Sequence, residues 1–397
     1  MEIEKRKMKP AVYLQEGREA TVLRGHPWIF PKAIHKESKH LVSGELVDVF
    51  TNKGQMLGTG VYNVHSLYRV RMLAYVFEDI DLSSLDSILR HRLRQAINVR
   101  KALLLPNDET NAYRLFNSEG DGLSGLTIDC FDQTIVVSSS AYWVELHREV
   151  ISQHICELLS IEEVIWIASP KPLLQDGWQN EKVQNKQVMR EVKEAGILFQ
   201  VDFSHTQKTG LFLDQRENHQ RIAKIAHGKK VLDLYTYTGG FALHAAKAGA
   251  KKVTAVDSSG DAIHLAKKNA SLNQLDSIEF IEADARDYLA SAGEYDLIIL
   301  DPPKLAPSKK HLQQAKNYYR FLHRELFKSI KQGALLFTCN CSSALSIPEF
   351  ADLVSMQASA QNKIARILGI YGPASCHPTL SAFPEGQYLT GILMAIV

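Results

Sequence analysis

From about residue 190 onward, short apolar segments of strand length alternate with longer segments of helical character. The apolar segments are Val231–Leu234, Lys252–Val256, Ile278–Ile281, Leu297–Leu300 and Ala334–Thr338. The intervening helical segments are Phe241–Ala248, Gly260–Asn273, Ala285–Ala292 and His311–Ile330. Because parallel strands need a crossover between them, this order predicts an α/β domain over residues 191–397. Its sheet should be mainly parallel, with helices on both faces.

The N-terminal regions have a different character. In residues 1–75, turn signals such as Gly25-His26-Pro27 separate short apolar runs, and Leu46–Phe50 and Tyr68–Met72 favour strands, which predicts a small β-rich domain. Residues 76–190 should form a mixed α/β middle domain. Its expected elements are helices over Leu82–Leu105 and Trp143–Leu159, strands over Leu126–Ile128, Thr134–Ser138 and Ile165–Ser169, and a linker or long hairpin over Gln175–Gln187.

The composition of the chain indicates its cellular compartment and the class of molecule that it binds. A chain of 397 residues exceeds what one core usually serves, and its apolar runs are far too short to cross a membrane. Five cysteines and no apolar leader predict reduced thiols in a cytoplasmic protein. Residues 1–75 hold 12 Lys and Arg against 7 Asp and Glu, which fits a nucleic-acid contact. A solvated basic tail explains this charge equally well.

The segment Val231–Phe241 contains the strongest local signal for a ligand site. A strand carrying Asp233 leads into a turn with Tyr235, Thr238, Gly239 and Gly240, and a helix follows. Glycines let a ligand approach the backbone, and the free N–H groups at the helix start can contact it. We therefore expect these five residues to bind a cofactor.

Three further acids follow the next three strands: Asp257, Asp284 and Asp301. Asp257 is placed to accept hydrogen bonds from ribose hydroxyls, and Asp284 to meet an adenine edge. One acid after a strand is usually a helix N-cap, but four in succession favour a site. The first turn lacks G-x-G-x-x-G, and Asp233 would repel a pyrophosphate, so a dehydrogenase is disfavoured. A cationic sulfonium without phosphate, as in S-adenosylmethionine, suits this acidic pocket.

The segments after the fourth and fifth strands predict the acceptor chemistry. They are Asp301–Lys304 and Thr338–Ser342. A thiolate that attacks C6 of a pyrimidine makes C5 nucleophilic enough to take a methyl group. Cys341 is the preferred thiol and Cys339 the second, with Lys304 favouring the thiolate. Cys130, Cys156 and Cys376 are expected to be inert.

Two points of this chemistry stay open. The alternative is methylation of an exocyclic amine, for which an Asp-Pro-Pro turn normally has an aromatic fourth residue. Lys304 stands there instead, which places the amine reaction second. Glu385, in Pro384-Glu385-Gly386, is a candidate acceptor of the C5 proton, and a surface turn is its alternative role.

With these residues identified, the chain resembles the class I RNA (cytosine-5) methyltransferases that carry an N-terminal PUA domain, the family typified by bacterial large-subunit ribosomal RNA methyltransferase I. The resemblance rests on Leu14–Glu19, Arg24–Phe30, Tyr113–Leu123, Lys208–Arg216, Tyr237–Phe241, Asp301–Lys304 and Pro384–Gly386. It implies a PUA domain, a mixed α/β middle domain and a Rossmann-like catalytic domain. It also implies that Lys208–Arg216, including Lys208, Gly210 and Phe212, covers S-adenosylmethionine, and that Cys341 is the nucleophile. Asn340 and Ser343 depart from the family's usual serine and glycine around that cysteine.

The resemblance further implies ribosomal RNA as the substrate, and family members can pair as homodimers. A basic PUA domain could hold RNA while the target base leaves its stack. The candidate RNA contacts are Arg24, His26, Trp28, Arg69 and Arg71. Trp28 is an equally good candidate for the core. Two other functions remain open: methylation of another RNA base, such as uracil, and RNA binding without catalysis.

Overall fold

The computed structural model of the chain describes residues 9–179, 189–203, 211–306 and 309–397. The chain forms two compact units. Unit 1 consists of Met1–Pro106, Ala112–Gln187 and Cys376–Gly386, and unit 2 of Asn107–Asn111, Val188–Ser375 and Gln387–Val397. The chain thus leaves unit 2 after Ser375 and re-enters it at Gln387. The predicted boundaries after residues 75 and 190 stay a prediction.

The first part of unit 1 is a six-stranded sheet in the order β2-β6-β5-β4-β1-β3. Its strands are β1 (Ala11–Leu14), β2 (Trp28–Ile29), β3 (Ile34–Glu37), β4 (Leu46–Phe50), β5 (Met56–Tyr62) and β6 (Val70–Tyr75), and α1 (Glu19–Leu23) follows β1. The side chains of Val12, Val47, Val49 and Leu57 pack in its core. The predicted β-rich character is confirmed. Strand β6 begins at Val70 rather than Tyr68, whose ring instead stacks on Trp28 with the centroids 4.0 Å apart.

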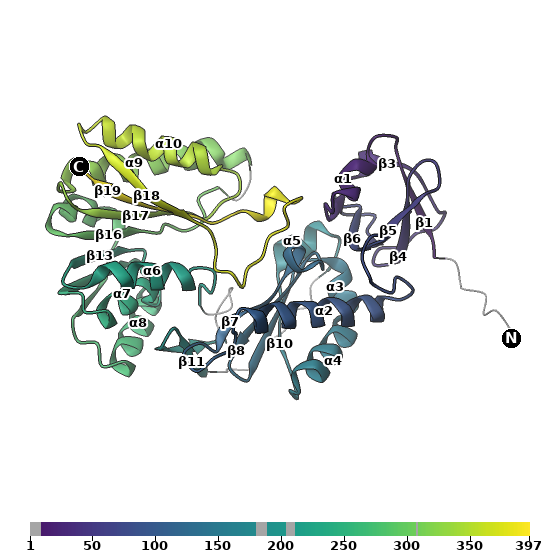
Figure 1. Cartoon of the computed structure of the whole chain (residues 1–397), viewed down its shortest axis with the longest axis horizontal. Coiled ribbons are helices and arrows are strands. Elements are labelled where there is room, and N and C mark those ends of the chain that lie inside the picture. The colour runs from purple at the N-terminus through teal and green to yellow at the C-terminus, as the bar shows by residue number, and fades with distance from the viewer. Residues whose placement is uncertain (1–8, 180–188, 204–210, 307–308) are drawn as a thin grey trace. The chain divides into compact units, whose positions relative to one another are not determined.

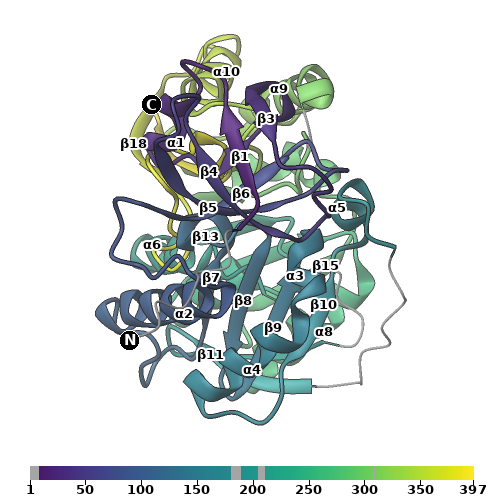
Figure 2. The ribbon, with the colours of Figure 1, turned by 90° about the vertical axis from the view of Figure 1, so that its right-hand side faces the viewer.

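The second part of unit 1 is a four-stranded sheet in the order β10-β9-β8-β7, whose strands β8, β9 and β10 lie side by side in Figure 2. Its strands are β7 (Ala112–Asn117), β8 (Leu126–Phe131), β9 (Thr134–Ser139) and β10 (Ile165–Ala168), and its helices are α2 (Leu85–Ala102), α3 (Tyr142–Leu146), α4 (Arg148–Leu159) and α5 (Pro170–Gln175). The helix expected over Trp143–Leu159 is two helices, since the backbone leaves helical geometry at His147. Helix α2 starts late because Ser84 caps it by accepting the Ser87 N–H at 3.1 Å.

Unit 2 is built on a seven-stranded sheet in the order β15-β14-β13-β16-β17-β19-β18. Strands β13 (Lys230–Leu234), β14 (Lys252–Asp257), β15 (Ile278–Glu282), β16 (Leu297–Leu300) and β17 (Leu335–Asn340) are parallel. Strand β19 (Thr390–Ile396) pairs antiparallel with both β17 and β18 (Ala365–Tyr371). A hairpin of β11 (Met189–Glu194) and β12 (Ile197–Asp202) precedes the sheet.

Helices cover both faces of this sheet, as predicted. On one side lie α6 (Arg216–Ala226), α7 (Gly240–Lys247) and α8 (Gly260–Leu272), and on the other α9 (Leu312–Ser329) and α10 (Ile347–Ser359) (Figure 1). Two buried clusters fill the two faces, one with Phe241 and Phe337, the other with Leu326 and Phe350. The helical segment expected over Ala285–Ala292 is a 3-10 segment that spans Ala285–Glu294. In the described part of the chain no helix is both long and apolar enough to cross a membrane.

Candidate functional site

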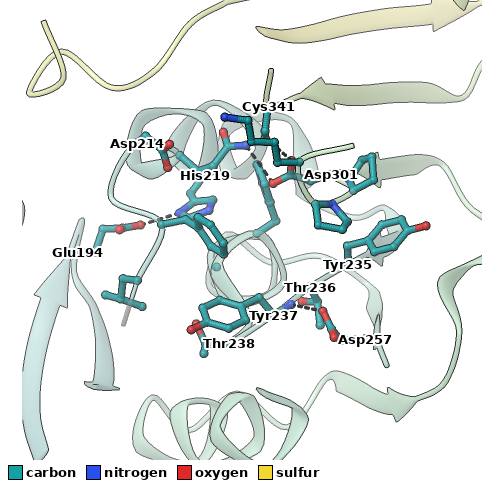
Figure 3. Close-up of a pocket in the computed structure, with 18 of the residues that line it drawn as sticks. Glu194, Asp214, His219, Tyr235, Thr236, Tyr237, Thr238, Asp257, Asp301 and Cys341 are labelled. Carbon is teal, nitrogen blue, oxygen red and sulfur yellow. Dashed lines mark hydrogen bonds and ion pairs between the residues drawn. The ribbon is translucent and has the colours of Figure 1, made fainter. Parts of the chain in front are cut away.

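A pocket of about 430 Å³ opens at the carboxyl ends of the parallel strands. Strand β13 lies between β14 and β16, so the crossovers on its two sides leave in opposite directions, which is where doubly wound sheets bind ligands. Figure 3 shows the side chains around this pocket. The predicted residues that line it are Phe212, Tyr235, Thr238, Gly240, Asp257, Asp301, Lys304 and Cys341.

The turn after β13 is held in an uncommon backbone conformation. Tyr235 and Tyr237 have φ angles of 67° and 51°, in the left-handed region that costs such residues about 1–3 kcal/mol each. Hydrogen bonds repay this strain: the Thr236 N–H donates to Val256 O at 3.0 Å, and the Tyr237 N–H donates to Asp257 Oδ2 at 2.9 Å. A Cβ on Gly240 would lie 2.5 Å from His219 Cε1, so only glycine lets α6 approach here.

Asp233 supports this turn from below and is not among the lining residues. It is fully buried, and its Oδ2 accepts hydrogen bonds from Thr236 Oγ1 at 2.6 Å and from the Ala242 N–H at 3.1 Å. Burial raises the pKa of Asp233 from an ordinary 3.8 to about 7. Gly239, with a φ of 92°, is the N-cap residue of α7 and also stays outside the lining.

The two acids after β14 and β15 have different positions. Asp257 lines the pocket, where it accepts the Tyr237 N–H and, at 2.9 Å, the Ser259 N–H. Asp284 caps the 3-10 segment by accepting the Arg286 N–H at 2.9 Å. The Arg286 side chain also bonds to Asp284 and lowers the pKa of its carboxyl group. Asp284 does not line the pocket, and its contact with an adenine edge stays a prediction.

The side chains of Cys341 and Asp301 lie next to each other in the lining of the pocket (Figure 3). The half-buried Cys341 Sγ–H points to Asp301 Oδ1 at 3.6 Å, and Gln215 Nε2 donates to Asp301 Oδ2 at 3.0 Å. Burial, with the nearby Asp214 charge, raises the pKa of Asp301 to about 6. Cys339 is fully buried, and burial raises the pKa of its thiol well above the ordinary value. Of these two cysteines, only Cys341 faces the pocket.

The sequence did not single out several lining residues. They include Glu194, Asp214, Gln215, His219 and Tyr388. Asp214 and Gln215 belong to the segment that the family resemblance places over the cofactor, and Tyr388 donates to Asp214 Oδ2 at 2.8 Å. No local pattern marks Glu194 or His219, which come together only in the folded chain. Lys208 and Gly210, predicted cofactor contacts, lie outside the described residues.

Unit 1 holds Glu385 and the predicted RNA contacts. Glu385, in the 3-10 turn Pro384–Gly386, is half exposed, and its Oε2 lies 3.7 Å from His26 Nε2. His26 and Arg71 are buried, and Trp28 Nε1 donates to Ser124 Oγ at 3.1 Å. Arg71 pairs with the buried Asp176 at 2.8 Å, because a buried guanidinium needs a counter-charge.

The structure therefore distinguishes among the five residues proposed to contact RNA. The side chains of His26, Trp28 and Arg71 contact other residues of unit 1. This differs from the predicted role of these residues as RNA contacts on the surface. Arg24 is exposed, and Arg69 is half-buried, with its guanidinium donating to Val64 O.

Comparison with known proteins identifies the two parts of this architecture. A family of S-adenosylmethionine-dependent methyltransferases matches residues 180–366, and the PUA-like domain family matches residues 12–75. The ribosomal RNA large subunit methyltransferase I of Aeromonas salmonicida is 35% identical over 399 residues, covering 98% of this chain and 99% of that protein. The protein of the same name from Alteromonas mediterranea is 34% identical over the same shares. The chain belongs to the ribosomal RNA large subunit methyltransferase I family.

Solved structures agree with this fold. A protein from Streptococcus mutans, assigned as an S-adenosylmethionine-dependent methyltransferase, superposes with a TM-score of 0.79 at 20% identity, covering 98% of this chain and 100% of that one. A second protein, assigned as a methyltransferase and crystallised with SAH, superposes with a TM-score of 0.81 at 21% identity, covering 97% of this chain and 100% of that one. The predicted family, fold class and cofactor are thus confirmed: this is an S-adenosylmethionine-dependent methyltransferase with an N-terminal PUA-like domain.

Proposed function

We propose that this methyltransferase modifies C5 of a cytosine in RNA, with large-subunit ribosomal RNA as its substrate. The observation that carries the proposal is the position of Cys341, half-buried in the cofactor pocket beside Asp301, while Cys339 is sealed in the core. The PUA-like domain and the relatives, which are named as ribosomal RNA methyltransferases, support RNA as the acceptor. Such a substrate implies action in the cytoplasm.

The residues of the pocket fit S-adenosylmethionine. Asp214, Asp257 and Asp301 line it, and carboxylates favour a cation and disfavour a phosphate. The Asp257 carboxylate lies at the end of β14, where it can accept hydrogen bonds from a ribose. Asp214 Oδ1 is buried without a hydrogen-bond partner among the described residues, so it can accept one from the ligand. When bound, the cofactor supplies an electrophilic methyl group.

The protein's own groups can prepare the base for methylation. Cys341 Sγ gives its proton to Asp301 Oδ1, whose raised pKa of about 6 makes it a better base than an ordinary aspartate. The thiolate then attacks C6 of cytosine, and the electron pair of the C5–C6 bond becomes available at C5 to take the methyl group. Lys304, exposed at the rim of the pocket, favours the anionic sulfur.

The reaction ends when a base removes the C5 proton and the S–C6 bond breaks, restoring the thiolate. Glu385 remains our proposal for this base, and it rests on the position of this acid just before the final apolar strand of the chain. A Glu385→Gln variant should transfer the methyl group but release product slowly, so that protein and RNA stay joined in a denaturing gel. Free RNA carrying methyl groups at the wild-type rate would remove Glu385 from the mechanism.

Nucleoside mass spectrometry tests the function as a whole. We expect ribosomal RNA from cells lacking the gene to lose one 5-methylcytidine, which the wild type restores and Cys341→Ala does not. Loss of an N-methylated nucleoside, restored by both, would instead support amine methylation by the Asp301-Pro302-Pro303 turn. Loss of a 5-methyluridine would point to uracil. No change in any nucleoside would favour RNA binding without catalysis.

Two parts of the proposal concern partners. Arg24 and Arg69 are the remaining predicted RNA contacts with side chains at least partly accessible, and replacing both with alanine should weaken RNA binding most at low salt. Pairing as a homodimer, which the family resemblance allows, is tested by the mass of the protein in solution.

A further inference from the structure

Three buried side chains form a cluster at one wall of the pocket. Glu194 ends β11, His219 lies in α6 and His244 lies in α7. Their exposed fractions are 1%, 6% and 4%. One nitrogen or oxygen atom from each lies within 4.8 Å of those of the other two. The proposed methyl transfer uses none of the three, so their chemistry needs its own explanation.

The hydrogen bonds of His244 fix where its lone pair points. Nδ1 lies 2.8 Å from Gly240 O, and a carbonyl oxygen only accepts, so Nδ1 carries the hydrogen. In the neutral ring, Nε2 then holds a lone pair, and it lies 3.7 Å from Glu194 Oε1. Nε2 is buried and has no hydrogen-bond partner among the described residues. Two acceptors thus face each other away from water, an arrangement that a positive charge between them would stabilise.

The same oxygen of Glu194 has a second imidazole beside it. His219 Nδ1 lies 2.7 Å from Glu194 Oε1, a hydrogen-bond distance (Figure 3). Two histidines and one glutamate form a ligand set typical of zinc. A metal-binding histidine commonly donates its other N–H to a backbone carbonyl, as His244 does to Gly240. This bond would orient the Nε2 lone pair toward the ion.

We propose that Glu194, His219 and His244 bind a divalent zinc ion, with a water molecule as the fourth ligand. Zinc ligands at about 2.0–2.1 Å in a tetrahedral set lie roughly 3.3 Å apart. The separations of 2.7 Å and 3.7 Å from Glu194 Oε1 to the two imidazoles must each adjust by about half an ångström, and the two imidazoles must lie at a similar distance from each other. His219 gives up its Nδ1 proton to solvent on binding. Glu194 and His219 line the pocket, which provides a route for the ion.

The ion would join three elements that are distant in sequence. It would link the end of β11 to α6 and α7, and so fix the wall of the pocket beneath Tyr237 and Gly240. The ion would stabilise the local fold, and the proposed methyl transfer uses none of its three protein ligands. The inference therefore stands whether or not the proposed cytosine chemistry is correct.

The test uses the full-length protein, freed of metal with a chelator and titrated with zinc ions. We expect one zinc per chain, and a rise in melting temperature on binding. Glu194→Gln and His244→Ala should each weaken binding by at least about 100-fold, since even residues that only orient ligands typically account for 10–100-fold. His264→Ala is the control, an exposed histidine on α8, and should bind zinc as the wild type does.

Folding of the variants can be separated from binding. Alanine is the best helix former, so His244→Ala should keep α7 intact, and Glu194→Gln keeps an acceptor for His219. Cooperative melting of each metal-free variant checks this. Zinc binding to both variants with wild-type affinity, or no binding to the wild type, would overturn the proposal. The cluster would then be a network that shares protons.

Discussion

Buried charges in unit 1 and around the pocket of unit 2 are treated in opposite ways. In unit 1, Arg71 pairs with Asp176 at 2.8 Å and Arg100 with Asp121 at 2.7 Å, and all four side chains are less than 10% exposed. In the described part of unit 2, the fully buried Asp233 and the partly exposed Asp301 have no lysine or arginine within 4 Å, and their pKa values rise to about 7 and about 6. Removing one partner of a buried pair would leave an uncompensated charge, whereas Asp301, which lines the pocket, can gain or lose a proton near neutral pH.

The largest expected effect distinguishes the two cysteines of the pocket region. Cys341→Ala should reduce methylation by at least about 10⁴-fold, because loss of a nucleophile removes the whole covalent route. Cys339→Ala is the matched control, because Cys339 lies two residues earlier, in β17, with its thiol buried away from the pocket, and the rate of this variant should stay within a few fold. Single-turnover assays with radiolabelled cofactor measure both. Comparable losses would mean that position relative to the pocket does not decide reactivity.

The next effect concerns the paired charges of unit 1. Arg71→Ala leaves Asp176 buried without its counter-charge and should lower the free energy of unfolding by about 3–5 kcal/mol. Arg90→Ala is the control, because Arg90 and Glu157 are 40% and 45% exposed, and it should cost less than about 1 kcal/mol. Urea denaturation measures both. If both variants lost the same free energy of unfolding, the contribution of an ion pair would not depend on its burial.

A smaller effect comes from the isolated Asp233. Its pKa of about 7, against an ordinary 3.8, means that the folded state holds the proton more tightly than the unfolded state. As pH rises from 5 to 8, the wild type should therefore lose stability relative to Asp233→Asn, by on the order of 2 kcal/mol. Urea denaturation of both proteins without cofactor, across this range, gives the difference. A constant difference would mean that Asp233 of the folded protein does not titrate between pH 5 and 8.

The smallest effect is that of Lys304 at the pocket rim. Lys304→Ala should slow methylation by about tenfold through a less favoured thiolate, and the loss should shrink at higher pH. Lys310→Ala, another exposed lysine in the following turn, serves as the control and should not change the rate. Rates measured from pH 6 to 9 separate a thiolate effect from weaker RNA binding, which would not depend on pH in this way.

The sequence predicted the parallel strands of unit 2 well because each is a compact apolar run, and an acid stands at or near the end of four of them, β13 to β16. It could not distinguish Asp257 from Asp284, since both follow a strand, and the hydrogen-bonding partners decide their roles. Tyr237 holds Asp257 toward the pocket, whereas Arg286 holds Asp284 at a helix start. The sequence did not identify Glu194 and His219 as residues of the site, because tertiary packing brings them together. No periodic pattern in the sequence indicates that they are close.

The path of the chain between β18 and β19 has a consequence for folding. Strand β19 pairs between β17 and β18, yet it follows both in sequence, and residues 376–386, which belong to unit 1, come before it. During synthesis β18 therefore emerges before the strand that joins it to the sheet. The sheet of unit 2 cannot close until the chain has supplied unit 1 with its final segment. Unit 1, which lacks only that short segment, can reach most of its structure earlier, so we expect it to form before the catalytic sheet during synthesis.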